Sequence, residues 1–221
     1  MSIETLVQQL SLAVRMVDHF SGQAVADELP LRLSGSLQRP VLRPGGGGRR
    51  QADGAYRFVN APAGPTRLMW CEPFARGHAG WTRWADDPLF VLPLADAAAL
   101  VDIDLWPTAN AAASPSVTGV RGRLTGSGAA GQTVRIAVQG EPFVRFTRSD
   151  DQGEFLFVPP GRMSLDAQGR VPLTLDVSAP DGTPRIVAGG SMVPASAGAA
   201  FAGADFTVLP RLISRVIFQL A

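Results

Sequence analysis

The chain has no lysine, one cysteine, one tyrosine and two histidines among its 221 residues. Because Cys71 is the only cysteine, no intramolecular disulfide can form, and the fold does not depend on an oxidising compartment. Only His19 and His78 can exchange a proton near neutral pH. This inventory leaves little from which to build a catalytic triad or a histidine-rich metal centre.

A large excess of charge of either sign is also missing. The sequence has 20 basic and 19 acidic residues, which gives a formal net charge of +1 at pH 7. A surface that binds nucleic acid through its phosphates needs a marked basic excess, so we expect no nucleic-acid partner. All the basic residues are arginines, which is typical either of bidentate recognition of carboxylates and phosphates or of codon usage in a GC-rich genome.

Long hydrophobic runs are absent, and none approaches the roughly 20 residues that a membrane-spanning helix needs. Residues 1–20 lack a basic start and carry Glu4, Gln8 and Gln9 within their apolar stretch, which is unlike a signal peptide. We therefore expect a protein that is cytoplasmic when it is made, that can be part of an assembled or released particle, and that has no membrane partner.

Glycine and proline, by contrast, are abundant, with 24 and 18 residues spread along the chain, which favours short strands joined by turns. Two segments also repeat one another. Residues 53–64 read DGAYRFVNAPAG, and residues 151–161 read DQGEFLFVPPG. Each has a glycine, an aromatic residue two positions later, the pair Phe-Val, and a proline-rich turn that ends in glycine. Such self-similarity indicates two copies of one folding unit.

The likeness between the copies extends from the first strand to the last. Residues 90–93 are echoed by residues 206–210, and residues 101–105 are echoed by residues 216–220. Hydrophobic residues alternate with others in both copies, which is typical of half-buried strands. We predict an all-β protein of two tandem immunoglobulin-like or transthyretin-like β-sandwiches, with the first at 1–107, a linker at 108–116 and the second at 117–221.

The repeated motif resembles the carboxypeptidase regulatory-like domain, a transthyretin-like or prealbumin-like sandwich of seven strands. The second copy matches more closely over residues 118–177, and the first copy matches more loosely over residues 12–71. The resemblance implies a non-catalytic module for folding support, adhesion or protein contacts. The matching residues are Asp151, Gly153, Phe155, Phe157, Pro160 and Gly161 in the second copy, and Asp53, Gly54, Tyr56, Phe58, Pro62 and Gly64 in the first.

No set of residues with an enzymatic pattern accompanies this motif. Ser21 follows His19 closely, but no nucleophile elbow is present. Intradiol dioxygenases, which have a similar sandwich, need two tyrosines and two histidines around iron, and Tyr56 is the only tyrosine. Cys71, His78, Asp86 and Asp87 share one loop region but match no standard metal-ligand spacing. We predict a protein that is not an enzyme and that needs no metal or cofactor.

Residues 70–88 are the most distinctive segment, because they hold three of the four tryptophans and have no aromatic counterpart in the second copy. Trp and Arg dominate binding energy at protein interfaces, and tryptophans also stack on sugar rings. Two interpretations stay open: a binding loop, or a loop that buries its own aromatics as a cap. The candidate binding residues are Phe74, Arg76, His78, Trp81, Arg83 and Trp84.

Two functional hypotheses follow. In the first, the chain is a structural protein that binds other protein subunits in a larger assembly, such as a phage-tail-like or contractile injection particle. Exposed sheet edges would then accept a strand or arm from a neighbour. In the second, the chain is a carbohydrate- or peptide-binding module in which Trp81 and Trp84 form the platform.

Overall fold

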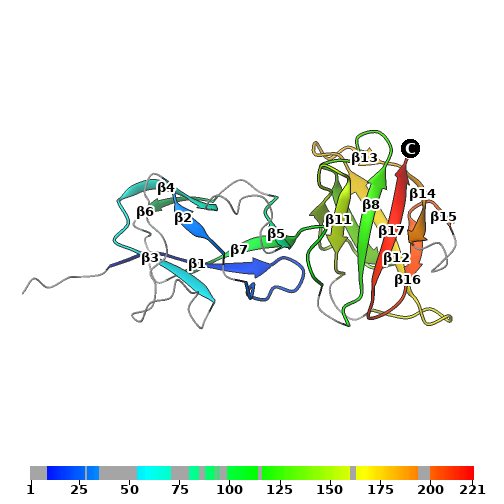
Figure 1. Ribbon diagram of the computed structural model, residues 1–221, viewed down its shortest axis with the longest axis horizontal. Coiled ribbons are helices and arrows are strands. Elements are labelled where there is room, and N and C mark those ends of the chain that lie inside the picture. The colour runs from blue at the N-terminus through cyan, green and yellow to red at the C-terminus, as the bar shows by residue number, and fades with distance from the viewer. Residues whose placement is uncertain are drawn as a thin grey trace, which may run out of the picture. The chain divides into compact units, whose positions relative to one another are not determined.

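In a computed structural model, the chain forms strands β1 to β17 and no α-helix in the residues that the structure describes (Figure 1). These residues are 9–27, 29–34, 54–70, 80–84, 88–92, 94, 99–113, 116–159, 163–193 and 200–221. Within these ranges, no helix is long and apolar enough to cross a membrane. The sequence prediction of an all-β protein is confirmed.

The chain divides into two units, one formed by residues 1–79 and 85–105 and the other by residues 80–84 and 106–221. In the first unit, β1 pairs antiparallel with β3 and parallel with β7. A second sheet has the order β2-β4-β6. The strands are β1 (Leu10–Asp18), β2 (Leu31–Leu33), β3 (Ala55–Val59), β4 (Gly64–Trp70), β6 (Leu89–Leu92) and β7 (Leu100–Pro107). The last two residues of β7, Trp106 and Pro107, belong to the second unit.

The second unit also has two sheets, of order β11-β8-β17-β14-β15 and β10-β9-β12-β13, and β16 pairs with β12 on the second of them. The short strand β5 (Trp81–Thr82) pairs with the last two residues of β7. The remaining strands are β8 (Gly119–Thr125), β9 (Thr133–Val138), β10 (Thr147–Arg148), β11 (Glu154–Phe157), β12 (Val171–Ser178), β13 (Pro184–Arg185), β14 (Val187–Val193), β15 (Phe201–Ala202), β16 (Asp205–Val208) and β17 (Ile213–Leu220).

The sequence repeat is reproduced in the pairing of the strands. In the first unit the motif strand β3 pairs with β1, and β1 pairs in parallel with the closing strand β7. In the second unit β11, β8 and β17 take the same three places. The strands β2, β4 and β6 likewise correspond to β9, β12 and β16. The repeat therefore reports architecture, as the sequence predicts.

The glycine of the motif lies in the turn just before the motif strand, which is β3 in the first unit and β11 in the second. Gly54 and Gly153 have φ angles of 79° and 76°, a left-handed conformation that favours glycine. A Cβ at Gly153 would also lie 2.6 Å from the carbonyl oxygen of Leu124. The Asp150 carboxylate caps this turn, because it accepts hydrogen bonds from the amides of Gln152 and Glu154 at 2.9 and 2.8 Å. The segment 149–154 is thus a charged turn, and it joins β10 and β11, which belong to different sheets.

The aromatic residues of the motif are buried. Phe155 and Phe157 lie in the core of the second unit, and Tyr56 and Phe58 lie in the core of the first. Around Phe218 the second core gathers further rings, whose centroids lie 5.2 to 6.2 Å away. Aromatic pairs at such distances add to the stabilisation from hydrophobic burial. The rings that surround Phe218 are those of Phe155, Phe201 and Phe206.

The segment 108–116, for which the sequence predicts a linker, is in part packed on the second unit. Ala109 and Ala111 are buried, and the carbonyl of Ala111 accepts a hydrogen bond of 2.7 Å from the Arg121 guanidinium. Just before this segment, Trp106 is buried and its indole N–H donates to the Phe146 carbonyl at 2.8 Å. Small apolar side chains therefore bury where the composition alone suggests exposure.

Candidate interaction surfaces

The tryptophan-rich loop is described only in part. Phe74, Arg76 and His78 lie outside the described residues, so their predicted role in binding stays a prediction. The structure does describe residues 80–84, which include Trp81, Arg83 and Trp84, and all three of these are half-buried. The predicted binding role of these three residues therefore stays a prediction as well.

Backbone hydrogen bonds hold the described part of this loop. Trp81 pairs with Pro107 as part of β5, and the Thr108 amide donates to the carbonyl of Gly80 at 2.7 Å. The Trp84 indole nitrogen is buried and has no hydrogen-bond partner among the described residues. The tryptophans are thus partly covered and keep some exposed surface, and both sequence interpretations stay open.

The histidine that the sequence considers for catalysis lies beside an aspartate of the first unit. His19 is buried, and its Nδ1 lies 3.2 Å from Oδ2 of Asp104. The nearby Ser21 hydroxyl instead donates to Oδ2 of Asp18 at 2.7 Å. Where the structure describes the chain, it also shows no group of three or more His, Cys, Asp or Glu side chains that could hold a metal ion.

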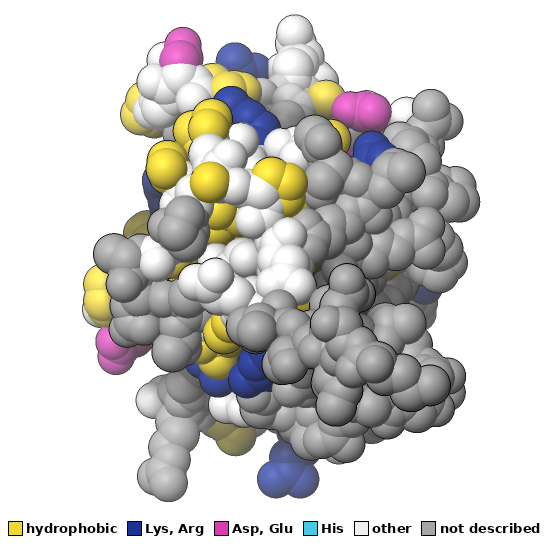
Figure 2. All heavy atoms as spheres, turned by 90° about the vertical axis from the view of Figure 1, so that its left-hand side faces the viewer, with side chains coloured by type: hydrophobic (Ala, Val, Ile, Leu, Met, Phe, Trp, Pro, Cys, Tyr) yellow, Lys and Arg dark blue, Asp and Glu magenta, His cyan; other side chains and the backbone are white. Residues whose placement is uncertain are grey.

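The first unit exposes aliphatic side chains on the edge strand β6. Leu89 and Val91 are 58% and 66% exposed, whereas Leu92 is buried. The amide of Leu68 donates to the carbonyl of Pro88 at 3.1 Å, which fixes the alternation of backbone groups along β6. Phe90 and Leu92 therefore turn their backbone groups toward β4, and Leu89 and Val91 turn theirs away from it. The face of this unit drawn in Figure 2 also shows hydrophobic side chains at the surface, with arginines among them.

The second unit has an equivalent edge in β16. The Leu175 amide donates to the Ala204 carbonyl at 3.0 Å, so Phe206 and Val208 turn their backbone groups toward β12. Asp205 and Thr207 turn theirs away from the sheet. In the described part of the chain, β16 pairs with no strand other than β12. An edge of this kind is a template for pairing with another strand.

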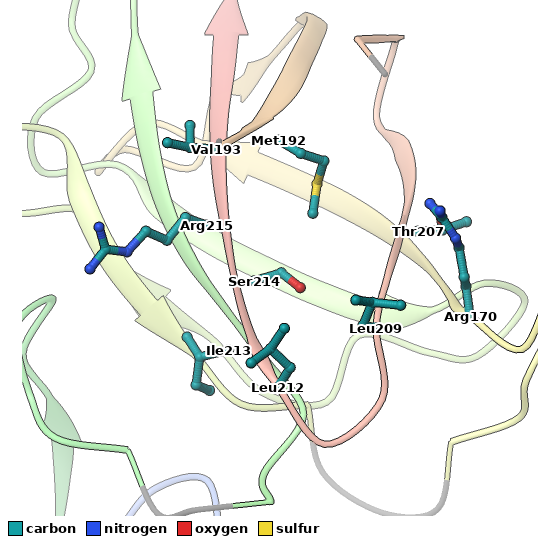
Figure 3. Close-up of a pocket in the computed structure, with 9 residues that line it drawn as sticks. All are labelled: Arg170, Met192, Val193, Thr207, Leu209, Leu212, Ile213, Ser214 and Arg215. Carbon is teal, nitrogen blue, oxygen red and sulfur yellow. The ribbon is translucent and has the colours of Figure 1, made fainter. Parts of the chain in front are cut away.

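A groove of about 530 Å³ runs beside β16 (Figure 3). Thr207 and Arg170 lie on one side of it, and Met192 and Val193 lie across from them. Leu209 is 46% exposed although it is a large aliphatic residue. The complete lining is Arg170, Met192, Val193, Thr207, Leu209, Leu212, Ile213, Ser214 and Arg215.

The lining of the groove includes two arginines and no acidic residue. The Arg170 guanidinium has no ion-pair or hydrogen-bond partner in the described residues. On the neighbouring sheet face, burial lowers the pKa of Arg121 below its usual range, repulsion from Arg215 lowers it further, and Glu154 opposes this shift. The groove therefore suits an apolar partner that brings a carboxylate.

The sequence analysis anticipates exposed sheet edges but not this groove. Its aliphatic floor comes from the turn between β16 and β17, where Leu209 and Leu212 flank Pro210 and Arg211. Turns usually carry small or polar residues, so two exposed leucines in one turn are the signal that could have located it. Arg170 comes from a turn that precedes β12 and has no counterpart before β4, which starts directly at Gly64.

No protein-family model and no curated protein matches the chain. Among solved structures, the chain is similar to the TIE protein of Bacillus anthracis, with a TM-score of 0.29 and 10% identity over 96% of this chain and 34% of that one. It is also similar to the shaft pilin spaA from Lactobacillus rhamnosus GG, with a TM-score of 0.25 and 11% identity over 97% and 98% of the two chains. A mutant of the major pilin from Streptococcus pyogenes gives a TM-score of 0.21 and 6% identity over 96% and 98%.

The chain thus spans about a third of the TIE protein and nearly all of each pilin chain. Because every one of these TM-scores is below 0.5, the β-sandwich assignment rests on the sheets and registers of this chain itself. The resemblance to carboxypeptidase regulatory-like domains stays a prediction from the repeated motif.

Proposed function

We propose that the chain is a non-catalytic structural protein that binds other protein subunits through the edges of its sheets. The observation that carries this proposal is the edge strand β6, which exposes Leu89 and Val91 and turns their backbone groups away from its own sheet. Proteins that avoid association protect such edges with charged residues or a bulge. β6 reads Leu-Phe-Val-Leu and has neither a charge nor a bulge; its protection is limited to its four-residue length and to Pro88 before it.

Because the fold is repeated, the second unit has an edge strand in the equivalent place. β16 occupies in the second unit the place that β6 occupies in the first, and it is unpaired on the same side among the described strands. A chain with two unpaired edges can bind two neighbours at once. Bivalent subunits of this kind build extended or closed assemblies, whereas a single edge gives only a pair.

For the kind of assembly, we propose the phage-tail-like or contractile injection particle that the sequence analysis names, assembled in the cytoplasm. Two observations support this particle: the described part of the chain has two unpaired edge strands, and the net charge is +1. A net charge this small allows copies to pack without strong repulsion. Electron microscopy of the assembly purified from its source organism tests this assignment. A tube with a contractile sheath supports it, and an assembly without either contradicts it.

The general proposal is tested by sedimentation velocity over a range of protein concentrations, with Val91→Lys as the principal variant. A lysine on an edge strand opposes pairing, so we expect weaker association with no loss of folding. Ile186→Lys is the matched control, because Ile186 is 74% exposed but lies outside the strands. The proposal fails if the unmodified chain stays monomeric at high concentration and also captures no partner protein.

A further inference from the structure

We infer that β16 pairs with β16 of a second copy of this chain, in antiparallel orientation about a two-fold axis at Thr207. This inference rests on the proposed function and names the partner of one of its two edges. It starts from the backbone of β16, where Asp205 and Thr207 turn their N–H and C=O groups away from β12. By the same alternation, Leu209 continues this outward series beyond the end of the strand.

Two-fold pairing uses all three outward residues. With Thr207 opposite Thr207, Asp205 of each copy lies opposite Leu209 of the other, and every outward N–H meets an outward C=O. An antiparallel pair of this geometry is isologous, because the same surface serves both copies. Pro210 and Arg211, whose φ angle is 58°, end the extended segment, so the pairing is limited to these three outward residues of each copy.

Charge complementarity favours this register over others. The pairing of Val171 with Val208 places Arg170 beside Leu209 on the outer face of the sheet. Asp205 lies on the same face at the opposite end of β16, where its Oδ1 accepts a hydrogen bond of 2.6 Å from Thr174. In the two-fold pair, Leu209 therefore lies between its own Arg170 and Asp205 of the second copy.

The distance suits an arginine. Two strand spacings separate Arg170 from Asp205 of the second copy, which is roughly 10 Å between their backbones. The long arginine side chain can cross Leu209 and reach the carboxylate, as arginine stems commonly lie along apolar surface. The two-fold axis makes this contact twice. It also gives Arg170, which has no ion-pair partner in the described residues, an acidic partner.

The pairing also covers apolar surface. The groove beside β16 exposes Leu209 and Leu212, and Met192 forms part of its opposite side (Figure 3). A second copy placed along the edge removes part of this surface from water. Burial of aliphatic side chains supplies the main free energy of association, and the two ion pairs set its register.

The test exchanges the charges. Asp205→Arg alone places like charges together twice in a pair of identical copies, and so does Arg170→Asp. Each single variant is expected to raise the Kd of self-association about tenfold or more, because two attractions become repulsions. An equimolar mixture of the two variants is expected to associate as the unmodified chain does, since each copy then offers the charge that the other lacks.

Analytical ultracentrifugation of each variant and of the mixture gives the Kd values. Asp151→Arg, the same change at an exposed turn residue next to β11, is the control and is expected to leave Kd unchanged. Leu209→Lys provides a second route if Asp205→Arg does not fold, and it is expected to weaken association as well.

The inference is overturned if the mixture associates no better than either single variant, or if the single variants associate as the unmodified chain does. If the unmodified chain is monomeric but binds another protein, the inference fails and the proposed function stands. If it is monomeric and binds no protein, both fail.

Discussion

The ring of Phe155 lies directly over Gly122 on the neighbouring strand. The two residues are register partners, and a Cβ at position 122 would lie 2.1 Å from Cζ of the ring. Phe155 cannot move away easily, because it is buried and its ring stacks on that of Phe218 with centroids 6.2 Å apart. Gly122→Ala is therefore expected to lower the free energy of unfolding of the second unit by about 1–3 kcal/mol.

Chemical denaturation followed by circular dichroism measures this loss. A double-mutant cycle with Phe155→Leu provides the control, because a shorter side chain leaves room for the new methyl group. The two changes together should cost less than the sum of the separate changes. Additive losses would show that the ring does not require glycine at position 122.

The Tyr56 hydroxyl is a second buried contact that is open to a test. The hydroxyl oxygen accepts a hydrogen bond of 2.9 Å from the Leu29 amide, and Tyr56 is buried in the first unit. Tyr56→Phe leaves this amide without its acceptor while keeping the ring. We expect a loss of about 1–3 kcal/mol in the free energy of unfolding, measured by denaturation of the variant and the unmodified chain. An unchanged free energy would contradict this role.

Trp106 is expected to stabilise the second unit. Its indole N–H donates to the Phe146 carbonyl, and the two rings lie 5.3 Å apart. Trp106→Phe removes the hydrogen bond and part of the ring contact, so the midpoint of thermal unfolding should fall, with a loss of about 1–3 kcal/mol. A variant that melts at the same temperature as the unmodified chain would show that Trp106 does not stabilise this unit.

The ion pair between Arg15 and Asp102 predicts a pH dependence for the first unit. Arg15 donates hydrogen bonds of 2.7 and 2.6 Å to the Asp102 carboxylate, and these bonds lower the pKa of Asp102 below its usual value of 3.8. A lowered pKa in the folded state means that the stabilisation is present above the unfolded pKa and is lost as the pH falls through the folded value. Because Asp102 is 47% exposed, the contribution is below about 1 kcal/mol.

Asp102→Asn is expected to remove this contribution at pH 7 and to approach the unmodified chain in stability below about pH 4. Urea denaturation at both pH values measures the difference. Asp151→Asn, at an exposed turn, serves as the control and should show no such convergence. A difference that grows on acidification would contradict the assignment.

The sequence predicts the repeated architecture because its signals are local. The glycine turn and the alternating aromatics of residues 151–161 determine strand and burial within a few residues, and the same pattern recurs at 53–64. Alternation in 101–105 likewise predicts that Val101, Ile103 and Leu105 face inward while Asp102 and Asp104 face outward. Ile103 and Leu105 are buried and both aspartates are exposed, whereas Val101 is only half-buried.

The proposed interaction surface could not be predicted in this way. Arg170 and Asp205 share a sheet face only because β12 and β16 pair in one particular register, and no local pattern specifies that register. The segment 108–116 shows the same limit. Its small residues predict a linker, but the neighbouring Arg121 binds the Ala111 carbonyl and two alanines are buried there.

Residue-resolved hydrogen exchange at low and high protein concentration tests the central claim most directly. If copies associate through their edge strands, the outward amides of Val91 in β6 and Thr207 in β16 exchange more slowly at high concentration. The inward amides of Phe90 and Phe206, already bonded within their own sheets, should change little. Association that leaves the exchange of Val91 and Thr207 unchanged would contradict the account.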